Sequence, residues 1–95
     1  MEQKIKLIHP AGKKAISMDK AKYDGMKKAI LNCLKNNGES THTEILNSVI
    51  ADFEKNKIQF EGSVEWHLEW VKLDLEARME IKRMDGSSPI RFKLV

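Results

Sequence analysis

Apolar residues recur at helical spacing in three segments of the chain, and the first runs from about residue 19 to residue 37. Its inward positions share the i, i+3, i+4 spacing of a core-facing helix; they are Tyr23, Met26, Ala29, Ile30, Cys33 and Leu34. Ser17 or Asp19 is suited to begin this helix, and Gly38 is suited to end it as a left-handed cap. Gly25 lies inside the helix, where glycine costs about 1 kcal/mol relative to alanine. We therefore expect a close packing contact at Gly25.

The second helical segment begins at a capping box. In the run Thr41-His42-Thr43-Glu44, Thr41 caps the backbone and Glu44 reaches back to it. The helix is expected to end near Asn56 and to present one apolar face, formed by Ile45, Leu46, Val49, Ile50 and Phe53. In the connection that follows, 57–62, we expect Ile58 and Phe60 to tuck under the core.

The third helical segment, from Ser63 to Arg78, has no proline and no internal glycine, and Ser63 is placed as its N-cap. At about 100° per residue, one line of apolar residues is formed by Val64, Leu68, Val71 and Leu75. A second line, nearly opposite, is formed by Trp66, Trp70, Leu73 and Ala77. One face can serve the core, whereas the other must be covered by the rest of the chain, a second copy or a partner.

Polar and apolar residues alternate near both ends of the chain, which predicts strands. Lys4 to Ile8 reads as a strand or arm, and residues 13–16 are expected to return as its partner after a turn at 9–12. Near the C-terminus, residues 79–83 and 90–94 flank a turn that contains Asp85-Gly86 and Ser87-Ser88. The returning strand is expected to point Ile90, Phe92 and Leu94 inward and Arg91 and Lys93 outward. Residues 39–41 are long enough for one short extended segment only.

The 95 residues are consistent with one domain, in which an N-terminal arm (1–18) packs on a body (19–95). Hydrophobic residues make up 41% of the chain and charged residues 33%, as in a globular domain and unlike a disordered one. Neither a signal peptide nor an apolar run of membrane-spanning length is recognisable. Cys33 is the only cysteine, so no internal disulfide can form. We expect a cytoplasmic protein without a membrane partner.

The net charge of +3 is distributed unevenly along the chain. Residues 1–38 carry nine lysines against three acids, residues 39–78 are net acidic, and the final segment is basic again. A basic rim on both sides of the third helix would suit a phosphate backbone; its candidate nucleic-acid-binding residues are Lys13, Lys14, Lys82, Arg83, Arg91 and Lys93. The alternative, which the modest net charge favours, is scattered solvated lysines.

The order of elements is helix, short extended segment, helix, longer helix and two-stranded hairpin. This order, together with the run VKLDLEARMEIKR at the end of the third helix, resembles the winged helix-turn-helix superfamily over residues 19–95. The runs GSVEWHLEWVKLDLEAR and HPAGKK also resemble a small, functionally uncharacterised bacterial family with that fold. The resemblance implies an α+β fold: a three-helix winged-helix domain with a C-terminal β-hairpin wing, here preceded by an N-terminal strand or hairpin.

The superfamily resemblance implies DNA binding, with the third helix in the major groove and the wing against the backbone. The groove-facing positions would then be Glu65, Trp66, His67, Glu69 and Trp70. This helix departs from the pattern because its acids, Glu65, Glu69, Asp74 and Glu76, outnumber Lys72 and Arg78. One stripe (Glu65, Glu69, Lys72, Glu76) would present mostly negative charge to phosphates.

An exposed aromatic anchor is the second functional candidate. Trp66, His67, Trp70 and Leu73 are candidate residues for binding a protein partner or a second copy in a homodimer, because buried aromatic side chains dominate interface energies. The alternative is that the N-terminal segment covers them through Ile5, Leu7 and Ile16, with Trp66 nearer the surface than Trp70.

Catalytic and metal sites have no support in the sequence. His9, His42 and His67 show no metal-ligand spacing with Cys33 or a carboxylate. Cys33 lies on an inward stripe, and no base or oxyanion site accompanies it. We therefore expect no catalytic residue, metal or cofactor. Two hypotheses stay open: a non-enzymatic winged-helix module that binds nucleic acid or regulates, and a protein-interaction or self-association domain that uses the Trp66/Trp70 face.

Overall fold

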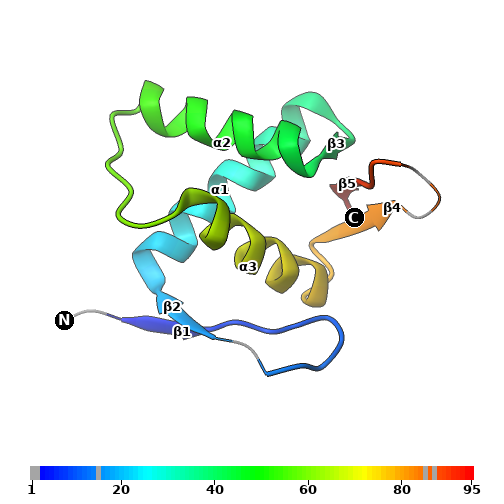
Figure 1. Ribbon diagram of the computed structural model, residues 1–95, viewed down its shortest axis with the longest axis horizontal. Helices are drawn as coiled ribbons and strands as arrows, with labels where there is room; N and C mark the ends of the chain where they lie inside the picture. Colours follow the sequence, from blue (N-terminus) through cyan, green and yellow to red (C-terminus); the bar gives the residue numbers. More distant parts are fainter. Residues whose placement is uncertain (1–2, 15, 85, 87) are drawn as a thin grey trace.

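Three helices form the body of the molecule: α1 (Lys20–Asn37), α2 (His42–Lys55) and α3 (Val64–Ala77) (Figure 1). The computed structural model describes residues 3–14, 16–84, 86 and 88–95. A small sheet adjoins the helices at the C-terminal end of α3, and a separate two-stranded hairpin runs beneath α3 in the view of Figure 1. The predicted α+β fold with three helices, a C-terminal hairpin and an N-terminal hairpin is confirmed.

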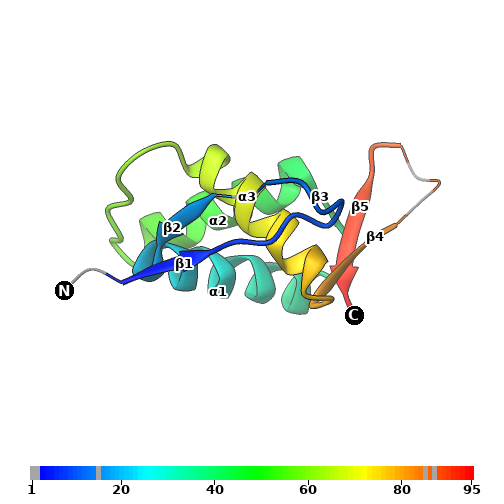
Figure 2. The ribbon, with the colours of Figure 1, turned by 90° about the horizontal axis from the view of Figure 1, so that it is seen from below.

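The C-terminal sheet joins β3 (Ser40–Thr41), β4 (Ile81–Met84) and β5 (Arg91–Leu94) in the order β3-β5-β4, all antiparallel. The hairpin of β4 and β5 projects from one end of the molecule (Figure 2), and we call it the wing. Asp85 and Ser87, in the predicted turn, lie outside the described residues. The predicted inward pattern is wrong at two positions: Phe92 is buried, but Ile90 and Leu94 are 41% and 36% exposed. A wing that projects beyond the helices has too little body beneath it to cover three apolar side chains.

Strand β4 begins two residues later than predicted because the end of α3 takes up residues 78–80. The backbone N–H of Glu80 donates to Leu75 O, and that of Met79 donates to Glu76 O. Met79 adopts a positive φ of 61° and is largely exposed. The alternating pattern that begins at Met79 in the sequence is therefore part helix-ending turn and part strand.

The N-terminal hairpin pairs β1 (Lys4–Lys6) with β2 (Ser17–Asp19), with Ile5 opposite Met18. The predicted return strand at residues 13–16 is too early; of these residues, Ala15 lies outside the described part of the chain. The hairpin loop is longer than expected because Asp19 both closes the pairing and caps α1, its side chain accepting from Lys22 N. Residues 3–19 of the hairpin and its loop are called the arm below.

All six predicted inward residues of α1 are buried, and they pack with Ile45, Val49 and Phe53 of α2 and Leu68, Val71 and Leu75 of α3. The capping box at Thr41 and Glu44 is present, and Gly38 ends α1 with a φ of 71° while its N–H donates to Leu34 O. On the second helix, Leu46 is only partly buried and Ile50 is exposed.

Two expectations about packing are wrong. An added Cβ at Gly25 would have no heavy atom within 4 Å, so no close contact accounts for this glycine. In the α2–α3 connection, Phe60 packs against the core as expected, whereas Ile58 is 46% exposed. Gly25, Ile58 and Phe60 all line the same hollow.

Candidate protein-binding face

The solvent-facing side of α3 carries an aromatic residue between acids, and we call it the α3 outer face: Glu65, Trp66, Glu69 and Leu73. Trp66 is 47% exposed, and Glu65 and Glu69 each leave 60% of the side chain accessible. Leu73 lies two turns beyond Trp66 and is half-buried. Leu68, Val71 and Leu75 of the predicted core-facing line are buried. Of the second predicted line, Trp66 is exposed, whereas Trp70 is partly buried against the core.

The other two predicted partner-binding residues point elsewhere. Trp70 is partly buried against the core, and His9 of the arm approaches its ring edge-on at 6.4 Å between centroids. His67 faces the α2–α3 connection, where its ring meets Phe60 at 4.8 Å and its Nδ1 lies 2.7 Å from Ser63 O. The expectation that Trp66 is nearer the surface than Trp70 is confirmed, and the arm is what separates them.

The arm is fixed to α3 through the buried carboxylate of Asp74, which the sequence analysis counted among the acids that outnumber the basic residues of this helix. Asp74 is 0% exposed and accepts hydrogen bonds from Ile8 N at 2.8 Å, from Arg78 Nε at 2.9 Å and from the Tyr23 hydroxyl. Burial raises the pKa of Tyr23 far above its usual range, and the hydrogen bond to Asp74 adds to the shift. The pKa of Arg78 is also raised, chiefly by its hydrogen bond to Asp74. The i, i+4 spacing of Asp74 and Arg78 was the one sequence signal of this cluster.

Lys72, expected on the acidic stripe, is instead buried between α3, α2 and the wing. Only 5% of it is exposed, its Nζ lies 2.8 Å from His42 Nδ1, and it stands 4.2 Å from the centroid of the Phe92 ring. Desolvation lowers the pKa of Lys72, although Glu69 and Glu76 oppose the shift. A charged lysine can only donate, so the neighbouring His42 Nδ1 then acts as acceptor.

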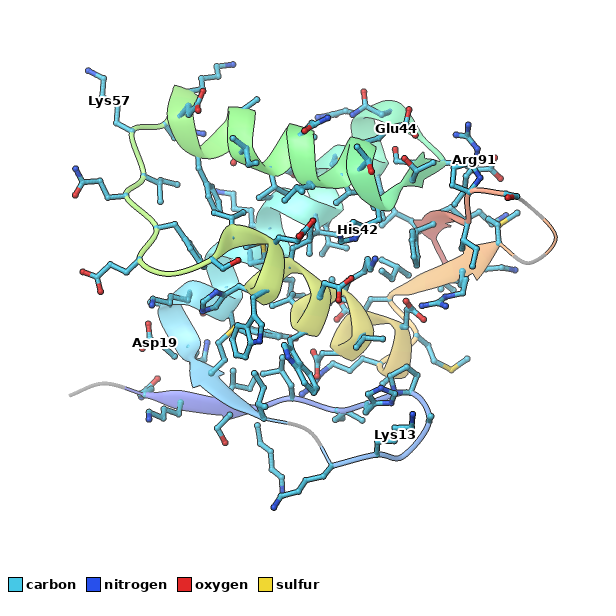
Figure 3. All side chains as sticks on the ribbon, viewed as in Figure 1. Lys13, Asp19, His42, Glu44, Lys57 and Arg91 are labelled. Carbon is cyan, nitrogen blue, oxygen red and sulfur yellow. The ribbon has the colours of Figure 1, made fainter. Side chains whose placement is uncertain are left out.

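His42 connects this buried lysine to the α3 outer face. Its Nε2 lies 3.5 Å from Glu65 Oε2, and its Nδ1 lies 3.9 Å from Glu69 Oε1. Figure 3 shows His42 at the start of α2, directed toward α3. Since Lys72 is withdrawn from the surface, the exposed part of the stripe is more acidic than the sequence suggested.

The four basic residues of the wing are divided between its two faces. Arg83 lies on the same face as Phe92, 5.4 Å from that ring, and pairs with Glu76 at 3.3 Å. Arg91 pairs with Glu44 at 3.5 Å, and Figure 3 shows the two side by side. The pKa of Glu44 is lowered, first by a hydrogen bond from the Thr41 backbone N–H and less by Arg91. Lys82 and Lys93 lie directly opposite one another across the two strands.

Lys13 and Lys14 lie in the loop of the arm, where they line a shallow hollow of about 330 Å³ together with Lys6. In the view of Figure 3, Lys13 lies below α3, and Arg91 lies above it at the wing. The six predicted basic residues therefore belong to two separate segments, the arm loop and the wing.

No three His, Cys, Asp or Glu residues in the described part of the chain are grouped so that they could hold a metal ion. Cys33 is a buried free thiol, with Asn37 Nδ2 3.7 Å from its sulfur. None of the helices in the described residues has the length and apolar character needed to cross a bilayer.

A family model covers nearly the whole molecule, from β1 to β5. It matches residues 4–92 and is described as a family of unknown function, DUF6958. No curated protein and no solved structure matches the chain. Membership in the winged helix-turn-helix superfamily stays a prediction that rests on the order of elements. The match includes the arm, the α3 outer face and most of the wing, and the chain belongs to the DUF6958 family.

Proposed function

We propose that the protein is a non-enzymatic binding module whose α3 outer face binds a basic segment of another protein. The observation that carries the proposal is the exposure of Trp66 between two accessible carboxylates, Glu65 and Glu69. Tryptophan is among the residues that most often dominate interface energies, and lysine or arginine side chains are attracted to its ring face. The flanking carboxylates provide ion-pair partners for the same cations.

A partner of different sequence fits this face better than a second copy does. In a twofold homodimer the same patch lies on both sides of the interface. Glu65 and Glu69 would then lie against the same acidic patch of the second copy, and like charges brought together across an interface cost several kcal/mol. A basic partner would place positive charges against Glu65 and Glu69, so its charges are complementary to the face.

The partner hypothesis is tested by selecting peptides from a random display library on the immobilised protein and measuring the dissociation constant of the enriched sequences. We expect enrichment of lysine and arginine, and we expect Trp66→Ala to weaken the selected peptides at least tenfold, as for an interface hot spot. Ile90→Ala is the matched control, since Ile90 is a similarly exposed apolar residue on the wing. Equal losses in the two variants, or selected peptides without basic residues, would contradict the proposal.

Nucleic-acid binding is the second candidate, and the observation in its favour is the pair of Lys82 and Lys93 directly opposite one another on the wing. Like charges opposite one another in a sheet are unfavourable unless an anion lies against them. This site would bind phosphates along the wing and leave the acidic α3 outside the groove.

The two candidates give opposite results with mixed-sequence duplex DNA. If the α3 outer face is the binding site, wild-type protein is expected to show no salt-dependent retention of duplex at about 50 mM salt, where phosphate contacts are strong. Retention that falls steeply with added salt and disappears in Lys82→Glu/Lys93→Glu would replace the first proposal with the second. Trp66→Ala serves as the control there, because it leaves the charge of the wing unchanged.

A further inference from the structure

A pocket away from the α3 outer face is lined by residues of the N-terminal half of α1, of α2 and of the α2–α3 connection. Figure 1 shows the path of this connection between the end of α2 and the start of α3. The pocket encloses about 280 Å³ and is lined by Ala21, Lys22, Gly25, Phe53, Ile58 and Phe60, with Gln59 and Glu61. That volume suits a molecule of one or two fused rings, since pockets for drug-sized ligands begin at about 300 Å³.

One wall of the pocket is aromatic, and another wall is formed by residues with very small side chains. Phe53 and Phe60 stack with nearly parallel rings, 5.3 Å between centroids and 15° between planes. Ala21 and Gly25 lie one turn apart on α1 and carry at most a methyl group, whereas Lys22 of the same helix lies at the rim. Ile58, which is half-exposed, adds apolar surface at the opening. A narrow space bounded in this way accepts a flat apolar ring.

Gly25 lines this space, and no close packing contact accounts for it. Glycine is a poor residue for a helix interior, and an added Cβ would have no heavy atom within 4 Å. Packing therefore does not require glycine, and a larger side chain would extend into the pocket. Stability alone would favour alanine or leucine at this position.

A cation is held in place at the rim. Lys22 Nζ donates to the backbone carbonyl of Glu61 at 3.1 Å and stands 5.7 Å from the centroid of the Phe60 ring. An ammonium group has three donors, so two remain for an anion beside the aromatic wall. Glu61 is the only acid in the lining, and it contributes its backbone to this arrangement.

We propose that this pocket binds a free small molecule that combines a flat aromatic ring system with one carboxylate. The ring occupies the space between Gly25 and the phenylalanine pair, and the carboxylate meets Lys22. This assignment is independent of the protein-binding function proposed above, because none of the pocket residues belongs to the α3 outer face.

The probe for the test is 2-naphthoate, titrated into ¹⁵N-labelled protein and followed by amide chemical shifts. We expect saturable shifts centred on residues 21–25 and 58–61, with a dissociation constant of about 1 mM or tighter for a ligand of this size. Gly25→Leu should weaken binding at least tenfold by filling the pocket. Asn32→Leu is the matched control, since it places the same side chain at an exposed position of α1 outside the lining, and it should bind like wild type.

The carboxylate requirement is tested separately with Lys22→Met, which keeps the aliphatic stem. It should weaken 2-naphthoate about fivefold or more and change the binding of uncharged 2-naphthylmethanol less than twofold. Four results would overturn the proposal: no saturable shift with wild type, shifts centred on other elements, equal binding by wild type and Gly25→Leu, or a C-terminal phenylalanine peptide that binds tenfold tighter than 2-naphthoate. The last result would assign the pocket to a peptide instead of a free small molecule.

Discussion

Replacing Asp74 with alanine is expected to lower the free energy of unfolding by about 3 kcal/mol, because removing one member of a buried charged cluster leaves its partners unsatisfied. Asp74 is fully buried and accepts hydrogen bonds from Tyr23, Arg78 and Ile8 N. Tyr23 is buried as well, so its hydroxyl cannot readily turn to water, whereas Arg78 is partly accessible and can regain water. In a domain of this size, such a loss corresponds to a fall of roughly 12–24 °C in Tm.

The measurement is urea unfolding of wild type and variants at pH 7, with Asp24→Ala as the control. Asp24 forms an even shorter ion pair, 2.7 Å from Lys20 Nζ, but both side chains are about half-exposed. Exposed pairs contribute between 0 and about 1 kcal/mol, so Asp24→Ala should change stability little. A loss in Asp74→Ala no larger than that in Asp24→Ala would show that the buried cluster does not hold the fold.

The same variant should also release the arm locally. The bond from Ile8 N to Asp74 and the edge contact of His9 with Trp70 are contacts between the arm loop and the α3 side chains. In a Trp66→Phe background, where Trp70 is the only tryptophan, Asp74→Ala is expected to increase quenching of Trp70 by iodide. Unchanged quenching in a folded variant would mean that Leu7, Ile5 and Ile16 hold the arm without the carboxylate.

Replacing Lys72 with methionine is expected to raise the free energy of unfolding at pH 7 by about 1–2 kcal/mol. A lysine residue that is only 5% exposed is replaced by an apolar side chain of similar length, and such exchanges are often neutral or stabilising. The ion–ring contact with Phe92 and the hydrogen bond with His42 are lost in the exchange, and the gain is expected only because desolvation of the charge exceeds them.

The pH dependence of this gain has a defined sign. The pKa of Lys72 in the folded protein lies below its ordinary value of 10.5. At a pH between the pKa of the folded state and that of the unfolded state, the unfolded chain therefore binds a proton that the folded chain has released. Wild-type stability therefore rises with pH in this window, and the advantage of Lys72→Met shrinks. The test is the difference in the free energy of unfolding between wild type and Lys72→Met, measured at pH 7 and at pH 9.5. Both pH values lie below the ordinary pKa of tyrosine, about 10.

Lys82→Met on the exposed surface of the wing is the control for the loss of one positive charge, and it should change stability by less than about 0.5 kcal/mol. A loss of stability greater than about 1 kcal/mol in Lys72→Met would reverse the interpretation. In that case the contacts of Lys72 with His42 and Phe92 would outweigh the cost of burying its charge.

The helices and their caps could be predicted because their signals are local. The inward stripe of α1, the capping box at Thr41 and the core-facing line of α3 depend on spacing within a few residues, and each is present in the structure. The ends of the strands and the burial of their side chains were harder to predict. Whether Met79 belongs to a strand depends on hydrogen bonds at the end of α3, and whether Ile90 is covered depends on how far the wing projects from the body.

The residues of the candidate protein-binding face were accessible to sequence reasoning. Trp66 and its acidic neighbours follow from helical spacing alone, and Trp66 was expected nearer the surface than Trp70, but the spacing could not say which segment covers Trp70. The structure separates them because the arm covers one side of α3 and leaves the other open. Neither the burial of Asp74 nor that of Lys72 could be predicted, since apart from Arg78 their hydrogen-bond and ring partners lie between 20 and 66 residues away along the chain.

The sequence by itself determined the order of helices and hairpins, the core-facing line of α3 and the negative charge along this helix, because these depend on local periodicity and composition. Tertiary structure alone decided which charges of α3 are exposed, where the arm lies and where the chain leaves a pocket beside Gly25. The physical reason is that burial of an individual side chain is set by elements that are distant in sequence. The residues of one helical turn do not specify which element will pack against them.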